Sequence, residues 1–282
     1  MSSIRSAGCL IIGDEVLNGK ILDTNSHYFA KNCFNKLKIP LKKTIVCGDD
    51  RNDIIESLKI LTNDCDFVIT SGGIGPTHDD ITYESIAEFY KLPVKIHEPT
   101  VERMESLRKD YLQNLQQNKK DAFLRMATFP YDVNDKIKVD YLYTDPKLWV
   151  PVVGLNQQVY ILPGVPQLFQ QLVDSLGDLL SQRIEGTSLR RYYVKTTTKE
   201  SDLAPFLSSL QHKCDEEFGG NVVKLGSYPH FSWKINTISI IGNEKVNDEK
   251  LRDIVEQVLK NIGGEAKEIS IEEEEKLTTT DP

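Results

Sequence analysis

Short apolar runs alternate with segments of helical periodicity over the first ninety residues of the chain. The runs at 7–12, 41–46 and 67–70 are short and apolar, as strands are, whereas 24–37 and 52–61 repeat apolar residues at helical spacing. This order is typical of βαβ units, in which helices join parallel strands and cover the sheet that the strands form. The sequence therefore predicts an α/β fold with a mostly parallel sheet flanked by helices.

The second half of the chain predicts a smaller domain of a different kind. A strand at 158–162 and a helix at 167–180, with prolines between them, complete the first pattern. A polar stretch at 183–187 follows, and the order after it is strand, helix, strand, strand, helix. We therefore expect a first domain at 1–186 and a small α+β domain at 187–266.

The charge balance of the chain limits its partners. The sequence has 34 Lys and Arg against 42 Asp and Glu, which gives a net charge of −8. Part of the excess lies in the tail 267–282, where four glutamates are consecutive, and such a run is usually solvated and disordered. Because nucleic-acid binding needs clustered basic residues and the sequence has no basic stripe, we expect no nucleic-acid partner.

Cysteine spacing and the lengths of the apolar runs point to a reduced, cytoplasmic protein. The five cysteines form no CxxC pair, which favours buried thiols over a zinc knuckle or a dithiol site. The first apolar run, at 9–12, is too short for a signal peptide, and no run is long enough to cross a membrane. We expect no membrane partner.

A glycine-rich segment after the third predicted strand is the strongest functional signal. It reads Ser71-Gly72-Gly73-Ile74-Gly75-Pro76-Thr77-His78-Asp79-Asp80 and precedes a predicted helix. Glycines let a backbone approach an anion closely, and the Ser71 and Thr77 hydroxyls can donate to a phosphate. A tight strand-to-helix turn would need the same glycines for geometry alone. The segment is neither a P-loop, since no Lys follows Gly75, nor a GxGxxG dinucleotide turn.

Carboxylates are concentrated in the loops that follow the three predicted strands. These loops, 13–25, 48–52 and 71–80, should meet at the carboxyl edge of a parallel sheet, where ligands of such folds bind. Oxygen ligands beside a phosphate site suit a hard divalent cation, although Asp50 and Asp79 also stand where helix caps belong. His78 is either an acid, a base or an incidental loop residue. The carboxylates are Asp14, Glu15, Asp49, Asp50, Asp79, Asp80 and Glu84.

Four ordered motifs resemble those of a known family. The segments 13–25, 48–50, 71–82 and 162–166 are similar to the molybdopterin-binding domain of molybdenum-cofactor (MoCF) biosynthesis, in the branch shared by CinA-type proteins and FAD synthases. The segment Gly226-Ser227-Tyr228-Pro229 resembles the KH-like domain that follows in that branch. The resemblance covers about residues 5 to 265.

The resemblance implies a hydrolase that depends on a divalent metal, Mg²⁺ or Co²⁺, and cleaves a nucleotide diphosphate such as ADP-ribose or FAD. The alternative is a non-catalytic module that binds a nucleotide or a pterin. The sequence contains neither an amidase nor an adenylyltransferase domain, so neither activity is expected. Related folds commonly self-associate, and by analogy we expect a homo-oligomer.

Roles carried over from the family fall into three groups. The expected catalytic residues are Asp49 and Asp80, which would hold the metal or orient a water molecule. The expected metal ligands are Asp80, Asp79 and Glu15, with Glu84 as a further candidate. The expected ligand-binding residues are Asn25, Ser71, Gly72, Gly73, Gly75, Thr77 and Ser227.

Overall fold

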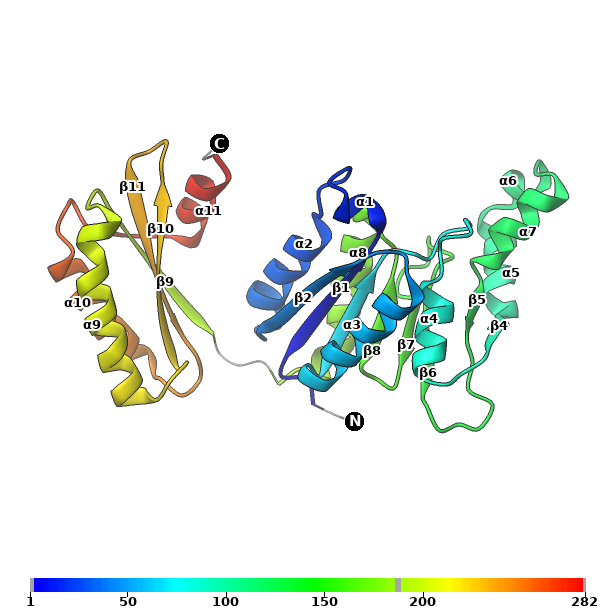
Figure 1. The fold of residues 1–282 in the computed structure, drawn as a ribbon, viewed down its shortest axis with the longest axis horizontal. Coiled ribbons are helices and arrows are strands. Elements are labelled where there is room, and N and C mark those ends of the chain that lie inside the picture. The colour runs from blue at the N-terminus through cyan, green and yellow to red at the C-terminus, as the bar shows by residue number, and fades with distance from the viewer. Residues whose placement is uncertain (1–2, 186–188, 281–282) are drawn as a thin grey trace. The chain divides into compact units, whose positions relative to one another are not determined.

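The computed structural model describes residues 3–185 and 189–280. The chain divides into two compact units, Met1–Gly186 and Thr187–Pro282. The sequence placed its domain boundary at the same position, and residues 186–188 lie outside the described residues. Figure 1 shows the elements of each unit.

A six-stranded sheet of order β2-β1-β3-β8-β7-β6 forms the centre of the first unit. The first four strands of that order are parallel, and β7 and β6 run antiparallel to their neighbours. The predicted α/β fold with a mostly parallel sheet is therefore confirmed. The strands are β1 Ala7–Ile12, β2 Leu41–Cys47, β3 Phe67–Ser71, β6 Val139–Leu142, β7 Val152–Leu155 and β8 Val159–Leu162.

Helices cover both faces of this sheet, because β1, β3 and β8 are buried along their whole length and their mostly apolar side chains point to both sides. One buried cluster joins β1 to α2 (Asn25–Asn32) and α8 (Pro166–Leu180). The other joins the opposite face to α3 (Arg51–Asp64) and α4 (Thr82–Phe89). A short helix, α1 (Asp14–Leu17), follows β1 directly.

The structure departs from the predicted helices in two places. The helix predicted at 24–37 is α2 followed by one π-helical segment, η1 (Cys33–Leu37). The long charged region from residue 98 forms three short helices, α5 (Glu98–Leu107), α6 (Lys109–Gln113) and α7 (Gln117–Arg125). Beyond it, β5 (Thr128–Pro130) pairs with β4 (Val94–Ile96), two strands that are too short to show a period in the sequence.

The second unit contains a four-stranded antiparallel sheet of order β10-β11-β9-β12. One face of that sheet packs on two helices around a core that includes Val194, Leu207, Ile238 and Val258. The strand, helix, strand, strand, helix order is as the sequence predicted. These elements are β9 Arg190–Thr196, α9 Glu200–Phe218, β10 Val223–His230, β11 Ile235–Gly242 and α10 Asp248–Asn261.

The acidic tail differs from the expectation of disorder. Lys267–Ile269 forms β12, which pairs with β9, and Ile271–Thr280 forms the helix α11. Ile269 is 6% exposed, and Glu273 accepts a hydrogen bond of 2.5 Å from Lys195 on β9. An apolar anchor and a basic partner therefore fold a segment whose composition alone favours solvation. Residues 281–282 lie outside the described residues.

The structure bears on two expectations, one about the cysteines and one about membrane-spanning segments. All five cysteines are free and buried, as the absence of a CxxC pair suggested. Among the described residues, no helix is long and apolar enough to cross a membrane.

The order of the tail can be tested by removing its apolar anchor. Ile269→Ala should lower the free energy of unfolding of the second unit by about 2 kcal/mol, because a buried isoleucine loses its contacts. Ile271→Ala serves as the control, since this side chain is 43% exposed and its loss should cost less than about 1 kcal/mol. Chemical denaturation of the two variants measures both values, and equal, small effects would show that the tail is not packed.

Candidate functional site

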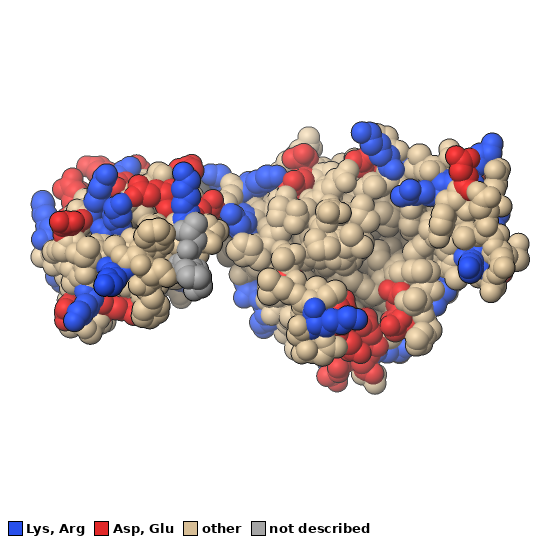
Figure 2. Space-filling view, turned by 90° about the horizontal axis from the view of Figure 1, so that it is seen from above, with Lys and Arg blue, Asp and Glu red and all other residues tan. Residues whose placement is uncertain are grey.

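A pocket of about 560 Å³ lies at the carboxyl ends of β1, β3 and β8. This is the edge at which the sequence predicted that the loops would meet, and ligands of parallel-sheet folds bind there. Figure 2 views the molecule from above, toward this edge, and shows acidic side chains gathered beside an uncharged surface of the first unit. Seven of the residues predicted from the sequence line the pocket: Glu15, Asn25, Ser71, Gly72, Gly73, Gly75 and Asp80.

The glycines of the loop are required by its geometry. Gly72 and Gly73 have φ values of 111° and 64°, which side chains rarely adopt. A Cβ on Gly72 would lie 2.1 Å from the carbonyl oxygen of Ile12, and one on Gly73 would lie 2.2 Å from the hydroxyl oxygen of Thr82. The loop thus packs directly on the end of β1, so the tight-turn explanation of these glycines holds whatever the loop binds.

Asp80 organises the far end of the same loop. Its carboxylate accepts hydrogen bonds from the backbone N–H of Gly75 at 2.6 Å and of Thr77 at 2.9 Å, and from the Thr77 hydroxyl. These are donors that the sequence assigned to a bound phosphate. In the described part of the chain, nothing accepts a hydrogen bond from the N–H groups of Gly73 or Ile74. The amides of Gly73 and Ile74 are therefore the ones left for a ligand.

Asn25 ties three segments of the pocket together. Its side-chain amide donates to the Ser71 hydroxyl at 2.9 Å and to the Gly164 carbonyl at 2.8 Å. The Asn25 side-chain oxygen is buried and has no hydrogen-bond partner among the described residues. Two of the predicted ligand-binding residues, Asn25 and Ser71, are thus hydrogen-bonded to each other in the pocket lining.

The acids of the first two loops lie together. Asp49 accepts a hydrogen bond of 3.0 Å from the backbone N–H of Asp14. Burial chiefly, and then the charges of Glu15, Asp14 and Asp79, raise the pKa of the Asp49 carboxyl, while the hydrogen bond from Asp14 lowers it. Negative charge is therefore concentrated beside the pocket, and a bound cation would reduce the repulsion between these carboxylates.

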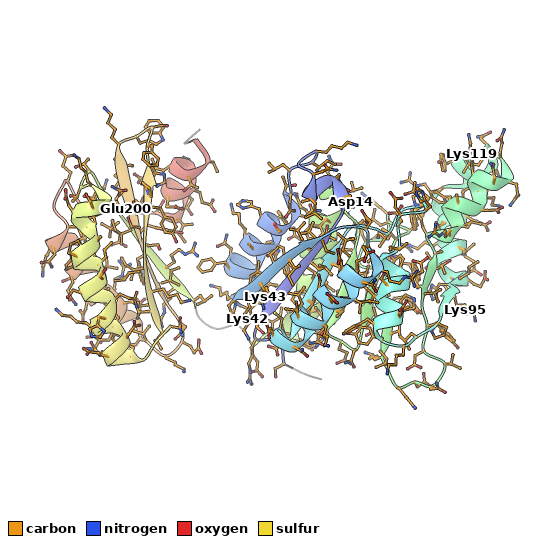
Figure 3. All side chains as sticks on the ribbon, in the orientation of Figure 1. Asp14, Lys42, Lys43, Lys95, Lys119 and Glu200 are labelled. Carbon is orange, nitrogen blue, oxygen red and sulfur yellow. The ribbon has the colours of Figure 1, made fainter. Side chains whose placement is uncertain are left out.

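Charge is distributed unequally between the two edges of the sheet. Asp14 lies at the carboxyl edge, whereas Lys42 and Lys43 lie at the other end of the strands (Figure 3). At that end Lys43 pairs with Asp64 at 2.7 Å. No Lys or Arg side chain within the described residues lines the pocket. An anionic ligand would therefore find amide donors and no basic side chain.

The remaining predicted residues have separate surroundings. Asp50 caps α3, as expected, by accepting from the N–H groups of Asn52 and Asp53. Asp79 was the other predicted cap, but α4 begins only at Thr82, with Ile81 in the capping position. The His78 ring is almost fully exposed and lies 4.0 Å from Asp79. Glu84 lies 3.4 Å from Arg125.

Ser227, the last of the predicted ligand-binding residues, lies on β10 of the second unit. Its hydroxyl is buried and has no hydrogen-bond partner among the described residues. Ser227 lines a depression of its own unit together with Gln211 and Asp215 of α9.

The sequence did not predict several residues at the site because they come from distant segments. Met126 and Trp149 line the pocket from the region that showed no clear period. Arg125, at the end of α7, donates to the carbonyl oxygens of Thr77 at 2.9 Å and of Asp80 at 3.3 Å. Arg125 thus holds the glycine-rich loop from outside the pocket lining. Only its position within the poorly patterned segment 123–148 could have drawn attention to it.

In the described part of the chain, no group of three or more His, Cys, Asp or Glu side chains is arranged to hold a metal ion. Of the acids that the sequence named as metal ligands, Glu15 and Asp80 both line the pocket. Asp80 is engaged by the loop, and Glu15 lines the pocket near Asp49.

The chain is similar to one known protein family and to several known proteins. The family profile described as "Probable molybdopterin binding domain" matches residues 8–182. A protein of Caenorhabditis elegans named "Probable FAD synthase" is 30% identical over 249 residues, which are 83% of this chain and 46% of that protein. A "Putative competence-damage inducible protein" of Clostridium botulinum is 30% identical over 209 residues, 72% of this chain and 48% of that protein.

Among solved structures, the protein CinA from Thermoplasma acidophilum, described as of unknown function, is similar to this chain. Its TM-score is 0.50 at 25% sequence identity, over 65% of this chain and 99% of that protein. The chain spans less than half the length of the two curated relatives above.

The packing of the loop on β1 predicts a large effect of a single methyl group. Gly72→Ala should lower the free energy of unfolding by more than about 3 kcal/mol, because the new Cβ meets the Ile12 carbonyl and the backbone is strained. Gly19→Ala is the matched control: its φ is 75°, but no atom lies within 4 Å of the added Cβ, so only about 1 kcal/mol of strain is expected. Equal losses in denaturant titrations would contradict the close approach.

The acids around Asp49 predict a pH-dependent gain of stability when its charge is removed. The folded chain holds the Asp49 proton more tightly than the unfolded chain, so the ionised carboxylate destabilises the fold once pH rises above about 4. Asp49→Asn should therefore raise Tm at pH 7 and leave it unchanged near about pH 3. Asp64→Asn is the control of opposite sign, because the Lys43 side chain lowers the pKa of Asp64 and its loss should lower Tm at pH 7. A lower Tm for Asp49→Asn at pH 7 would contradict the repulsion.

Proposed function

Because this chain belongs to the family of probable molybdopterin-binding domains, we propose that the pocket of its first unit binds a nucleotide diphosphate, such as ADP-ribose or FAD, and hydrolyses the diphosphate with the help of a divalent cation. The observation that carries the proposal is the pairing of unengaged amides in the glycine-rich loop with the acids of Asp14, Glu15 and Asp49 beside it.

The diphosphate would bind at the loop. The N–H groups of Gly73 and Ile74 have no acceptor among the described residues, and backbone amides of a glycine-rich turn are suited to anions. The Asn25 side chain and the Ser71 hydroxyl lie at the same end of the pocket and are hydrogen-bonded to each other. No Lys or Arg among the described residues lines the pocket, so we expect a cation from solution to neutralise the two phosphate charges.

A ring system of the ligand would lie against the apolar part of the pocket. Ile21, Leu22 and Val165 are exposed apolar residues of its lining, and Trp149 and Leu168 are partly buried there. Exposed apolar side chains around a concave site are characteristic of small-molecule pockets. A nucleotide or pterin ring would remove this surface from water.

The acids fit a cation that the substrate helps to bind. Mg²⁺ is usually held by one or two carboxylates together with substrate phosphates, and needs no closed cage of protein ligands. Asp49 and Glu15 would take this role, supported by the mutual effect of their charges, to which Asp79 adds. When bound, the cation would neutralise charge on the phosphoryl oxygens and activate a water molecule. Asp49, whose pKa is raised, would accept the proton of that water. Asp80 would act by keeping the loop in shape.

One observation favours the second candidate, a module that binds its ligand without converting it. The Asp80 carboxylate already accepts hydrogen bonds from Gly75 and Thr77, which removes one of the two acids predicted to be catalytic from the chemistry. Tight binding of ADP-ribose with no product would support this candidate.

The hydrolase is tested by measuring AMP release. The purified chain with Mg²⁺ or Co²⁺ should release AMP from ADP-ribose or FAD, and EDTA should stop the release. Asp49→Asn should lower kcat by at least about 100-fold because the general base is lost. Asp80→Ala should abolish the activity because the loop loses its support.

Asp64→Asn is the matched control for that assay, since Asp64 pairs with Lys43 at the opposite edge of the sheet. This variant should keep the activity of the unchanged chain. Release of AMP that is unaffected by Asp49→Asn and Asp80→Ala would exclude the proposed site.

A further inference from the structure

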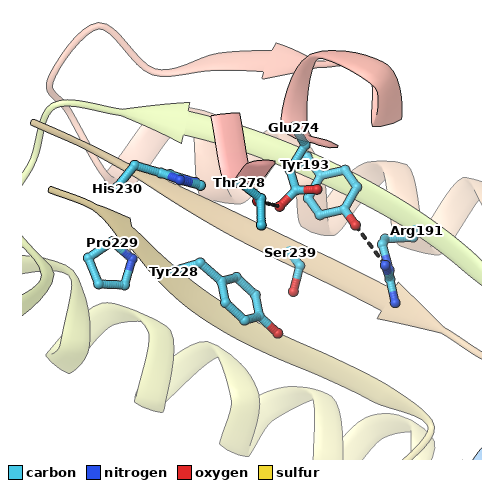
Figure 4. Close-up of a pocket in the computed structure, with 8 residues that line it drawn as sticks. All are labelled: Arg191, Tyr193, Tyr228, Pro229, His230, Ser239, Glu274 and Thr278. Carbon is cyan, nitrogen blue, oxygen red and sulfur yellow. Dashed lines mark hydrogen bonds between the residues drawn. The ribbon is translucent and has the colours of Figure 1, made fainter. Parts of the chain in front are cut away.

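The second unit contains a hollow of its own. It has a volume of about 490 Å³ and lies on the sheet face opposite α9 and α10, beneath α11. Figure 4 shows side chains from β9, β10 and β11 on its floor and the side chains of Glu274 and Thr278 reaching it from α11. Its main polar residues are Arg191, Tyr193, Tyr228, Ser239 and Glu274.

The floor of the hollow includes a row across the sheet in which two of three neighbouring residues are small. Gly226, Ser239 and Tyr193 are neighbours in register on β10, β11 and β9. A Cβ on Gly226 would lie 3.0 Å from the Ser239 hydroxyl oxygen and 3.1 Å from the Tyr228 ring. The missing side chain of Gly226 therefore lets the Tyr228 ring and the Ser239 hydroxyl lie against the backbone of β10.

The Ser239 side chain is the first group in the hollow that calls for a ligand. Ser239 is 3% exposed, and its hydroxyl has no hydrogen-bond partner among the described residues. The hydroxyl lines the hollow, so its donor and its acceptor are available to a group bound there.

A basic and an acidic side chain, Arg191 and Glu274, both line the hollow. Glu274 accepts a hydrogen bond of 2.9 Å from Thr278, and no cationic side chain in the described part of the chain pairs with it. Arg191 donates to the Tyr193 hydroxyl at 2.7 Å. The charges of both Arg191 and Glu274 act on the pKa of the Tyr193 phenol, which burial raises, Arg191 lowers and Glu274 raises. Both groups are therefore near Tyr193.

We propose that this hollow binds a small zwitterion, a free amino acid with an aromatic side chain, through Glu274 on its ammonium group, Arg191 on its carboxylate and Ser239 as a hydrogen-bonding partner. A simple anion would be repelled by Glu274, and a simple cation by Arg191. The rings of Tyr228 and Tyr193, with Pro229 beside them, supply flat apolar surface for an aromatic ring. This site lies within the second unit and does not depend on the function proposed for the first.

Isothermal titration of the full chain with L-phenylalanine tests the proposal. Two derivatives separate the charges: N-acetyl-L-phenylalanine lacks the ammonium group, and L-phenylalaninamide lacks the carboxylate. L-Phenylalanine should bind saturably, and each derivative should bind at least about tenfold more weakly, because one charged contact is lost. Absence of saturable binding, or equal binding of all three compounds, would overturn the proposal.

Substitutions of residues that line the hollow test which of them contact the bound amino acid. Glu274→Gln should weaken L-phenylalanine about tenfold while leaving the already weak binding of the N-acetyl derivative unchanged. Ser239→Ala should weaken binding severalfold with the fold intact, since the hydroxyl has no hydrogen-bond partner among the described residues. Glu249→Gln, an exposed acid of α10, is the matched control and should bind as the unchanged chain does. Circular dichroism confirms folding, and an unaltered affinity in folded Glu274→Gln would refute the assignment.

Discussion

The hydrogen bonds from the Gly75 and Thr77 amides to the Asp80 carboxylate fix the shape of the glycine-rich loop, and the candidate site depends on that shape. At its other end the loop lies so close to β1 that a Cβ on Gly72 would overlap the Ile12 carbonyl. Between these two attachments the amides of Gly73 and Ile74 have no acceptor among the described residues. An internal carboxylate thus uses some of the loop's donors and leaves others for a ligand.

Three kinds of chemical group lie at or beside the pocket, namely backbone amides, carboxylates and apolar side chains, and each kind comes from a different part of the chain. Amides come from the loop after β3, acids from the loops after β1 and β2, and apolar surface from residues such as Leu22, Trp149 and Val165. No lysine or arginine of the described residues lines it, so we propose that phosphate binding there relies on dipoles and on a cation from solution. The acids that repel each other around Asp49 are the natural place for that cation.

The sequence predicted the parallel strands of the first unit because β1, β3 and β8 are short apolar runs bounded by polar loops. It also predicted which loops would meet, since the carboxyl ends of parallel strands share one edge. It could not predict that Asp80 turns into the loop while Asp79 stays exposed, because hydrogen bonds of a folded turn decide between neighbours. Met126, Trp149 and Arg125 were missed because tertiary packing alone brings them to the site. The tail was misjudged because one buried residue, Ile269, outweighs four consecutive glutamates.

The proposed function requires that amides of the glycine-rich loop bind a diphosphate beside the acids. Nuclear magnetic resonance of the ¹⁵N-labelled chain, titrated with ADP-ribose and Mg²⁺, tests this binding. We expect the amide signals of Gly73 and Ile74 and the side-chain amide of Asn25 to shift together, and Mg²⁺ to strengthen the binding. Signals at the loop that stay unchanged while shifts occur elsewhere would contradict it.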